Sequence, residues 1–105
     1  MAWLLLIVAG VLEIGWAVGL KYTDGFTRPG PTVAVVLVMA VSLAMLGLAV
    51  RTLPVGTAYA VWTGIGTVGT VLLGIYLFNE PSDATRLIFI AMIVAGIVGL
   101  KLVTP

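Results

Sequence analysis

Four long apolar stretches, separated by three short polar segments, run through the chain. The apolar stretches cover residues 2–20, 32–50, 57–78 and 86–103. Each is close to the roughly 20 residues that a helix needs to cross the hydrocarbon core of a bilayer. The segments between them hold most of the charged residues, together with Gly and Pro, which mark turns. The pattern therefore predicts an all-α membrane protein, a single domain of four transmembrane helices.

Two other interpretations of the apolar stretches are weaker. The first stretch has the length of a secretory signal peptide, but it lacks a basic start and a small-residue cleavage site, and it carries Glu13 in its middle. Buried helices of a soluble protein are the other alternative. However, 62% of the 105 residues are hydrophobic and only 9% are charged, against about 25% charged residues in a soluble domain. A chain of this size has too little interior to bury so many apolar side chains.

Composition excludes several kinds of chemistry. The chain has no His and no Cys, so zinc, copper and iron–sulfur sites, disulfides and thiol nucleophiles are not expected. No phosphate-binding GxxxxGK[ST] loop occurs, and a net charge of +1 gives no basic surface for nucleic acid. We therefore expect no enzyme, no metal, no cofactor and no ATP-driven step.

The basic residues are almost evenly divided between the two sides of the membrane. With four spans, Arg51 and Lys101 lie on the side of the termini, whereas Lys21, Arg28 and Arg86 lie on the other side. Membrane proteins are normally oriented by a clear excess of Lys and Arg on the cytoplasmic side. Either the chain inserts one way with a weak bias, or both orientations occur and pair antiparallel. Two antiparallel copies would supply the inverted halves on which many transporters are built.

Glu13 is the most informative residue, because it lies near the centre of the first span. An ionised group at such depth costs about 2.5–3.5 kcal/mol on insertion scales, and no basic residue stands near the middle of any span. A protonated carboxyl with a purely structural role is one interpretation. The other is a binding site: desolvation disfavours the carboxylate, whereas a bound cation favours it. Proton and cation would then exclude each other, as an antiporter requires.

Three residues are candidates for the surroundings of this acid. Gly10 and Trp16 stand three residues before and after Glu13, on one side of the helix. Gly10 would allow a backbone or a ligand to approach closely, and Trp16 would place an aromatic ring beside the acid or belong to the interfacial belt. Ser42, the one interior hydroxyl of the second span, either bonds a carbonyl one turn earlier in its own helix or orients Glu13.

The third span presents an aromatic pair and small residues. Tyr59 and Trp62 are one turn apart, and Thr63, Gly66 and Thr70 continue nearly the same face. Aromatic rings attract cations by up to roughly 2 kcal/mol when desolvated, so the pair is either part of a cation site or a packed aromatic stripe. The glycines favour either a hinge or close packing.

Small residues point to two further features. The predicted hinge consists of Gly64 and Gly66. The fourth span has small residues at every fourth position, a pattern that lets helices approach closely in lipid and predicts either dimerisation or contact within one chain. This predicted dimerisation stripe is Ala91, Ala95 and Gly99, with Gly96 beside it.

Taken together, the motifs resemble those of the small multidrug resistance family. The likeness extends over the whole chain. It rests on the acid of the first span and on the motifs Leu20-Lys21-x-x-Asp24-Gly25-Phe26-Thr27-Arg28, Pro54-x-Gly56-x-Ala58-Tyr59-Ala60-x-Trp62-x-Gly64-x-Gly66, Asn79-Glu80-Pro81 and Gly96-Ile97-Val98-Gly99-Leu100-Lys101. The resemblance implies an antiparallel, dual-topology homodimer that exports cations across the bacterial inner membrane in exchange for protons.

Within that family, Trp16 and Ser42 resemble the guanidinium-exporting subtype, since the drug-exporting subtype usually has a small residue in place of the Trp. The resemblance implies that Glu13 binds the cation or the proton. The implied surrounding shell is Trp16, Ser42, Tyr59 and Trp62, with Gly10 as a position of close approach. The nearest alternative is a broad exporter of quaternary ammonium drugs. A membrane adaptor without transport activity and a passive cation channel are alternatives from other classes.

Overall fold

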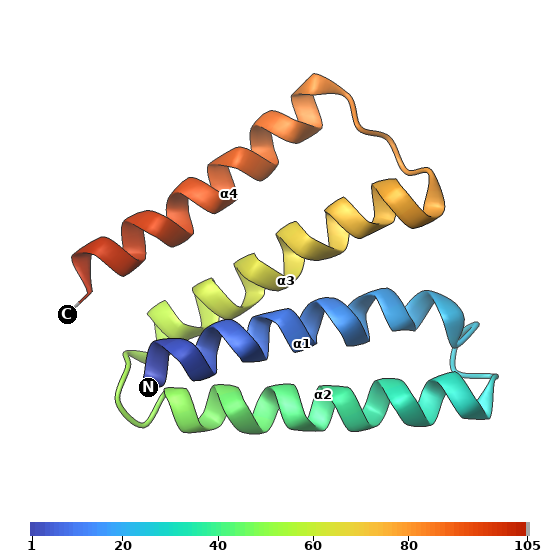
Figure 1. Ribbon diagram of the computed structural model, residues 1–105, viewed down its shortest axis with the longest axis horizontal. Coiled ribbons are helices and arrows are strands. Elements are labelled where there is room, and N and C mark those ends of the chain that lie inside the picture. The colour runs from blue at the N-terminus through green and yellow to red at the C-terminus, as the bar shows by residue number, and fades with distance from the viewer. Residues whose placement is uncertain (105) are drawn as a thin grey trace.

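Four long helices joined by short loops make up the computed structural model, which describes residues 1–104 (Figure 1). The helices are α1 (Ala2–Tyr22), α2 (Pro29–Ala49), α3 (Val55–Phe78) and α4 (Ala84–Val103). No strand occurs in residues 1–104, and each helix is long and apolar enough to cross a membrane. The prediction of an all-α chain with four apolar, membrane-length helices is confirmed.

The helix ends depart from the predicted spans by up to three residues, for local reasons. α2 begins at Pro29 rather than residue 32, because proline lacks a backbone N–H and suits the first helical turn. α4 begins at Ala84 rather than residue 86, since Asp83 caps it by accepting a hydrogen bond from the Arg86 backbone N–H at 3.4 Å. α3 ends at Phe78, because the next residue, Asn79, adopts a left-handed conformation (φ 53°) that commonly stops a helix.

The helices form a flat arrangement, with principal extents of 42 × 35 × 16 Å. α1 lies between α2 and α3 and packs along both, whereas α4 packs against α3 and diverges from it toward the 79–83 loop (Figure 1). Glycines allow the close contacts. A Cβ at Gly10 would lie 2.8 Å from Ile65 of α3, and one at Gly19 would lie 2.7 Å from Val35 of α2. Small residues at such contacts are typical of helices packed in lipid.

The buried core occupies the end of the molecule that holds the N terminus and the 50–54 loop (Figure 1). It consists of Leu6, Ala9, Ala49, Leu53, Ala58, Val61 and Trp62. Most other large apolar side chains are exposed, and in residues 84–103 no side chain is buried. Apolar faces this extensive require lipid or another protein surface to cover them.

The residues predicted to bend α3 and to contact a second copy lie in contrasting surroundings. Gly64 and Gly66 are buried within α3, which is one continuous helix. A Cβ at Gly64 would lie 2.8 Å from Ile97 of α4, so this glycine allows the two helices to pack. The predicted dimerisation stripe faces away from the rest of the chain: Ala91, Ala95 and Gly96 are exposed and Gly99 is half-buried.

Candidate cation-binding site

Glu13 lies at the contact between α1 and α3. Its carboxylate rests against the α3 backbone at Gly66, so closely that a Cβ at Gly66 would collide with Oε2. Glycine is therefore required at this position if the carboxylate is to keep its place. A cavity of about 250 Å³ adjoins the acid. Its lining residues are Glu13, Ala17, Gly66, Thr67, Thr70 and Val71.

Several buried polar atoms around this region have no hydrogen-bond partner within residues 1–104. They are Glu13 Oε2, Trp16 Nε1, Thr63 Oγ1 and Thr70 Oγ1. Leaving one buried polar group unpaired costs about 1–3 kcal/mol, and more for a charged group. Such groups are rare in native structures and each calls for an explanation. A polar ligand with hydrogen-bond donors would provide the missing partner for Glu13 and for the Thr70 hydroxyl in the same cavity. A proton would instead neutralise the Glu13 carboxylate.

Ser42 links three helices, but not in either of the predicted ways. Its buried hydroxyl donates to the Ala9 carbonyl of α1 at 2.7 Å and accepts from Trp62 Nε1 of α3 at 3.0 Å. It bonds neither its own helix nor Glu13. In an α-helix the Ala9 carbonyl is also the acceptor for the Glu13 backbone N–H. Ser42 and Trp62 therefore hold the turn of α1 that carries the acid, while leaving its carboxylate unpaired.

Trp16 and Glu13 lie one turn apart on α1 but line different cavities. Trp16 contributes to a cavity of about 240 Å³ between α1 and α2, together with Gly19 and Val38. The acid lines the cavity between α1 and α3. The structure therefore does not bring the indole of Trp16 to the carboxylate. Gly10 is buried against α3, so its close approach is to a helix rather than to a ligand.

The aromatic pair of α3 is half exposed. The ring centroids of Tyr59 and Trp62 are 5.7 Å apart, with an angle of 49° between the ring planes. Trp62 is buried and bonded to Ser42, whereas Tyr59 is 57% exposed. In a single chain, Tyr59 thus presents an open aromatic face rather than a closed wall of a pocket.

Charges outside the site are few. In the part of the chain that the structure describes, Glu13 takes part in no ion pair, and no cluster of three acidic side chains has metal-binding geometry. Asp83 and Arg86 form an exposed ion pair of 2.8 Å at the start of α4. The hydrogen bond from Arg86 holds the pKa of Asp83 below its ordinary value. Glu13 is thus a single acid without a basic partner.

Sequence reasoning overlooked two features of the site. Ala17 and Val71, which are apolar, also line the cavity of Glu13. Gly66 was assigned to a hinge, yet in the structure it is the surface on which the carboxylate rests. A signal was available: Gly66, Thr70 and Gly74 recur every four residues and therefore share one face of α3.

An apolar four-helix chain with an unpaired carboxyl between two of its helices is a multi-pass membrane protein, and an acid at this depth is a candidate for a substrate, ion or proton site. Residues 1–93 match the family described as Small Multidrug Resistance protein. The chain belongs to this family, in agreement with the resemblance of its motifs, and it is a protein of the bacterial inner membrane.

Three curated relatives extend over almost the whole chain. A relative from Citrobacter freundii is 58% identical over 104 residues, 99% of both chains. One from Proteus vulgaris is 58% identical over 102 residues, 97% of this chain and 98% of the relative. One from Salmonella typhimurium is 54% identical over 102 residues, 97% of both chains. Each of the three is named a guanidinium exporter, which is the name of a transport protein rather than of an enzyme.

Proposed function

We propose that the protein is a proton-coupled antiporter that exports guanidinium, and that Glu13 binds either a proton or the cation but never both. The observation that carries this proposal is the buried, unpaired carboxylate oxygen of Glu13 at the cavity between α1 and α3. The names of the relatives support guanidinium as the cation.

Guanidinium suits this site chemically. It is planar, and its N–H groups match a carboxylate in a bidentate pair, which is stronger than hydrogen bonds between neutral groups. The hydroxyl of Thr70 is an unpaired acceptor in the same cavity. A cavity of about 250 Å³ has room for this small cation. Selectivity then arises from hydrogen bonding, because a cation without N–H donors leaves the polar groups unpaired.

The working unit in this proposal is an antiparallel homodimer. One chain is a single four-helix domain only 16 Å thick, with Tyr59 exposed, and an inverted second copy would close the site from the open side. The nearly even division of Lys and Arg between the two membrane faces agrees with insertion in both orientations. The outward-facing stripe on α4 supplies a contact surface: Ala91, Ala95, Gly96 and Gly99.

Exchange follows from competition for one carboxyl. Guanidinium binds the ionised form of Glu13, and a proton arriving from the opposite face displaces it. Gly64 and Gly66 allow α3 to change its curvature while the site opens alternately to each side. Ser42 and Trp62 hold the turn of α1 that carries the acid, and Tyr59 offers an aromatic face to the cation. Trp16 lines the neighbouring cavity between α1 and α2 and would come to the cation only if α1 turned. Gly10 keeps α1 close to α3.

A second function is favoured by one observation, the exposed ring of Tyr59 beside Trp62. An open aromatic face attracts quaternary ammonium ions by cation–π interaction. A broad exporter of such cations is the alternative. It predicts transport of bulky aromatic cations, whereas a site selective through hydrogen bonds prefers guanidinium.

The experiment is proton-driven flux in proteoliposomes, with wild-type protein, Glu13→Gln and the control Asp24→Asn compared side by side. Asp24 is an exposed loop residue, so the control also removes one acid but leaves the site intact. We expect an imposed pH gradient to concentrate guanidinium with the wild type and the control, and Glu13→Gln to abolish this uptake. Strong transport of aromatic quaternary cations without guanidinium transport would refute the choice of substrate. Flux without accumulation against a gradient would indicate a channel, and an unchanged Glu13→Gln phenotype would indicate a structural acid.

A further inference from the structure

The side chain of Glu80 rests on α3 in the same way as that of Glu13. It folds back from the loop after α3 and lies against Gly74, where an added Cβ would collide with Oε1. The backbone N–H of Glu80 also donates to the Gly74 carbonyl at 3.3 Å. Two carboxylates thus rest on glycines of the same helix, at Gly66 and at Gly74.

These two glycines and Thr70 form one face of α3. Residues 66, 70 and 74 are four positions apart, so they succeed one another at steps of about 6 Å along the helix axis. Thr70 lies between the two carboxylates, and its buried hydroxyl oxygen has no partner within residues 1–104. Two carboxylates, one hydroxyl and bare glycine backbone thus follow one another along this face, beside apolar residues such as Ala17 and Val71.

The cavities between α1 and α3 follow the same line. The cavity of Glu13 and a neighbouring cavity of about 230 Å³ share two lining residues, Ala17 and Thr70. The second cavity continues to Glu80 and Lys21 at the loop end of the helices. We call the two cavities together the α1–α3 seam. Each is several times larger than the roughly 30 Å³ that a water molecule occupies in the liquid.

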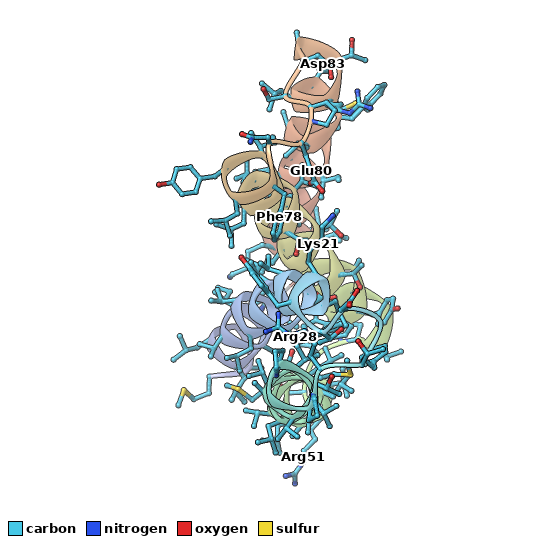
Figure 2. All side chains as sticks on the ribbon, turned by 90° about the vertical axis from the view of Figure 1, so that its right-hand side faces the viewer. Lys21, Arg28, Arg51, Phe78, Glu80 and Asp83 are labelled. Atoms are coloured by element: carbon cyan, nitrogen blue, oxygen red, sulfur yellow. The ribbon has the colours of Figure 1, made fainter. Side chains whose placement is uncertain are left out.

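The outer mouth of the seam carries opposite charges. Lys21 Nζ lies 5.3 Å from the centroid of the Phe78 ring, and both residues line the cavity with Glu80. Figure 2 looks onto this end of the molecule and shows Lys21, Phe78 and Glu80 following one another from α1 toward the loop after α3. From α4, Arg86 lines the cleft on the other side of Glu80, but it is paired with Asp83.

We propose that the α1–α3 seam is the proton route between Glu13 and the membrane face that holds the 23–28 and 79–83 loops, with Glu80 as its outer proton carrier. A proton from solution binds the Glu80 carboxylate. It then passes through water in the two cavities and past the Thr70 hydroxyl to the Glu13 carboxylate, and Glu80 becomes ionised again.

The proposal rests on the proposed antiport function and specifies from which membrane face, and by which path, protons reach Glu13. In an antiparallel pair, the seams of the two copies would open to opposite membrane faces, so that each face would have its own proton entry. Guanidinium binds in the cavity of Glu13 but need not pass through the second cavity toward Glu80, because it can enter from the open side of Glu13. The proton route and the cation route are therefore separable by mutation.

The test compares two activities of the same proteoliposomes: guanidinium-driven proton movement, followed with a pH-sensitive dye, and isotopic guanidinium–guanidinium exchange, which requires no net proton transfer. For Glu80→Gln we expect proton movement to fall roughly a hundredfold, at the lower end of what a positioned proton-transfer group contributes. Exchange should keep its wild-type rate, which also shows that the variants are folded. Gly74→Ala should act like Glu80→Gln, because the added methyl displaces the carboxylate.

Asp24→Asn and Gly30→Ala serve as matched controls, since Asp24 is an exposed acid at the same membrane face and a Cβ at Gly30 meets no atom within 4 Å. Both should retain both activities. Wild-type proton movement in Glu80→Gln would overturn the proposal, and so would equal loss of proton movement and exchange. Failure of the wild type to exchange guanidinium at all would instead refute the proposed function.

Discussion

Replacing Ser42 with Ala tests the link between the three helices. The change removes the bond to the Ala9 carbonyl and leaves Trp62 Nε1 buried without an acceptor. The Ala9 carbonyl keeps the helical bond from Glu13, so the unpaired indole dominates the loss. A hydrogen bond between membrane helices averages about 0.6 kcal/mol. An unpaired buried donor costs about 1–3 kcal/mol, so we expect a total near 2–3 kcal/mol.

The assay is equilibrium unfolding in mixed micelles, in which SDS is titrated and the free energy of unfolding is extrapolated to its absence. Trp62→Phe keeps most of the ring but removes the indole donor. The double variant should therefore lose less than the sum of the single losses, by about 1 kcal/mol, because Ser42→Ala no longer leaves a donor unpaired. Additive losses would show that the two side chains are not coupled and would refute this account of the link.

Three other predictions follow from single contacts. Gly66→Ala should weaken guanidinium binding tenfold or more, measured by calorimetry, because its Cβ displaces the Glu13 carboxylate and a charged hydrogen bond contributes about 1.5–3 kcal/mol. Gly10→Ala should lower the free energy of unfolding by about 1–3 kcal/mol, since the added methyl overpacks the facing isoleucine of α3. Because Arg86 lowers the pKa of Asp83, the stabilisation from this pair is present above the ordinary Asp pKa and is lost as the pH falls through the lowered value. Asp83→Asn should remove that pH dependence from the unfolding midpoint in acid.

Controls separate these effects from general damage. Gly30→Ala adds a methyl where no atom lies within 4 Å, so it should change neither binding nor stability. Asp24→Asn removes an exposed acid that forms no ion pair within residues 1–104, and it should leave the pH dependence of the unfolding midpoint in place. Asn also tolerates the positive φ of 50° at this position. The contact at Gly66 would be contradicted if Gly66→Ala bound guanidinium as tightly as the wild type. The contact at Gly10 would be contradicted if Gly10→Ala unfolded with the wild-type free energy. The Asp83–Arg86 pair would be contradicted if Asp83→Asn kept the pH dependence of the unfolding midpoint in acid.

The sequence predicts the four helices well because their signal is local. Runs of about 20 apolar residues ended by Pro, Gly and charge determine where each helix lies, and the errors are confined to the ends, as at Pro29. The partners of polar side chains are not local. Ser42 bonds a carbonyl 33 residues away, and no pattern within its own span indicates that acceptor.

Helix rotation explains why the neighbours of Glu13 were only partly predicted. Residues three apart on a helix differ by about 60° around its axis, because three residues at 3.6 per turn fall short of a full turn. In a thin arrangement with α1 between two helices, that angle suffices to turn Trp16 toward α2 while Glu13 faces α3. The sequence can place both residues near one level of the membrane, but the direction of each depends on how α1 is packed.

The packing of α1 changes at Glu13, and this change bears on how the acid can move. The buried residues of α1 are Leu6, Ala9 and Gly10, all of which precede the acid, whereas the turns after it line cavities toward both α2 and α3. Protein interiors resist rearrangement where they are close-packed and yield where contacts are missing. The acid therefore lies at the boundary between a half-helix whose residues reach the core and one that is mostly half-buried, although Gly19 of the later half packs closely on Val35 of α2. Movement of the later half would shift the carboxylate relative to Gly66 without breaking the core or the bonds of Ser42, which is the mechanical property that the proposed alternating exposure of Glu13 requires.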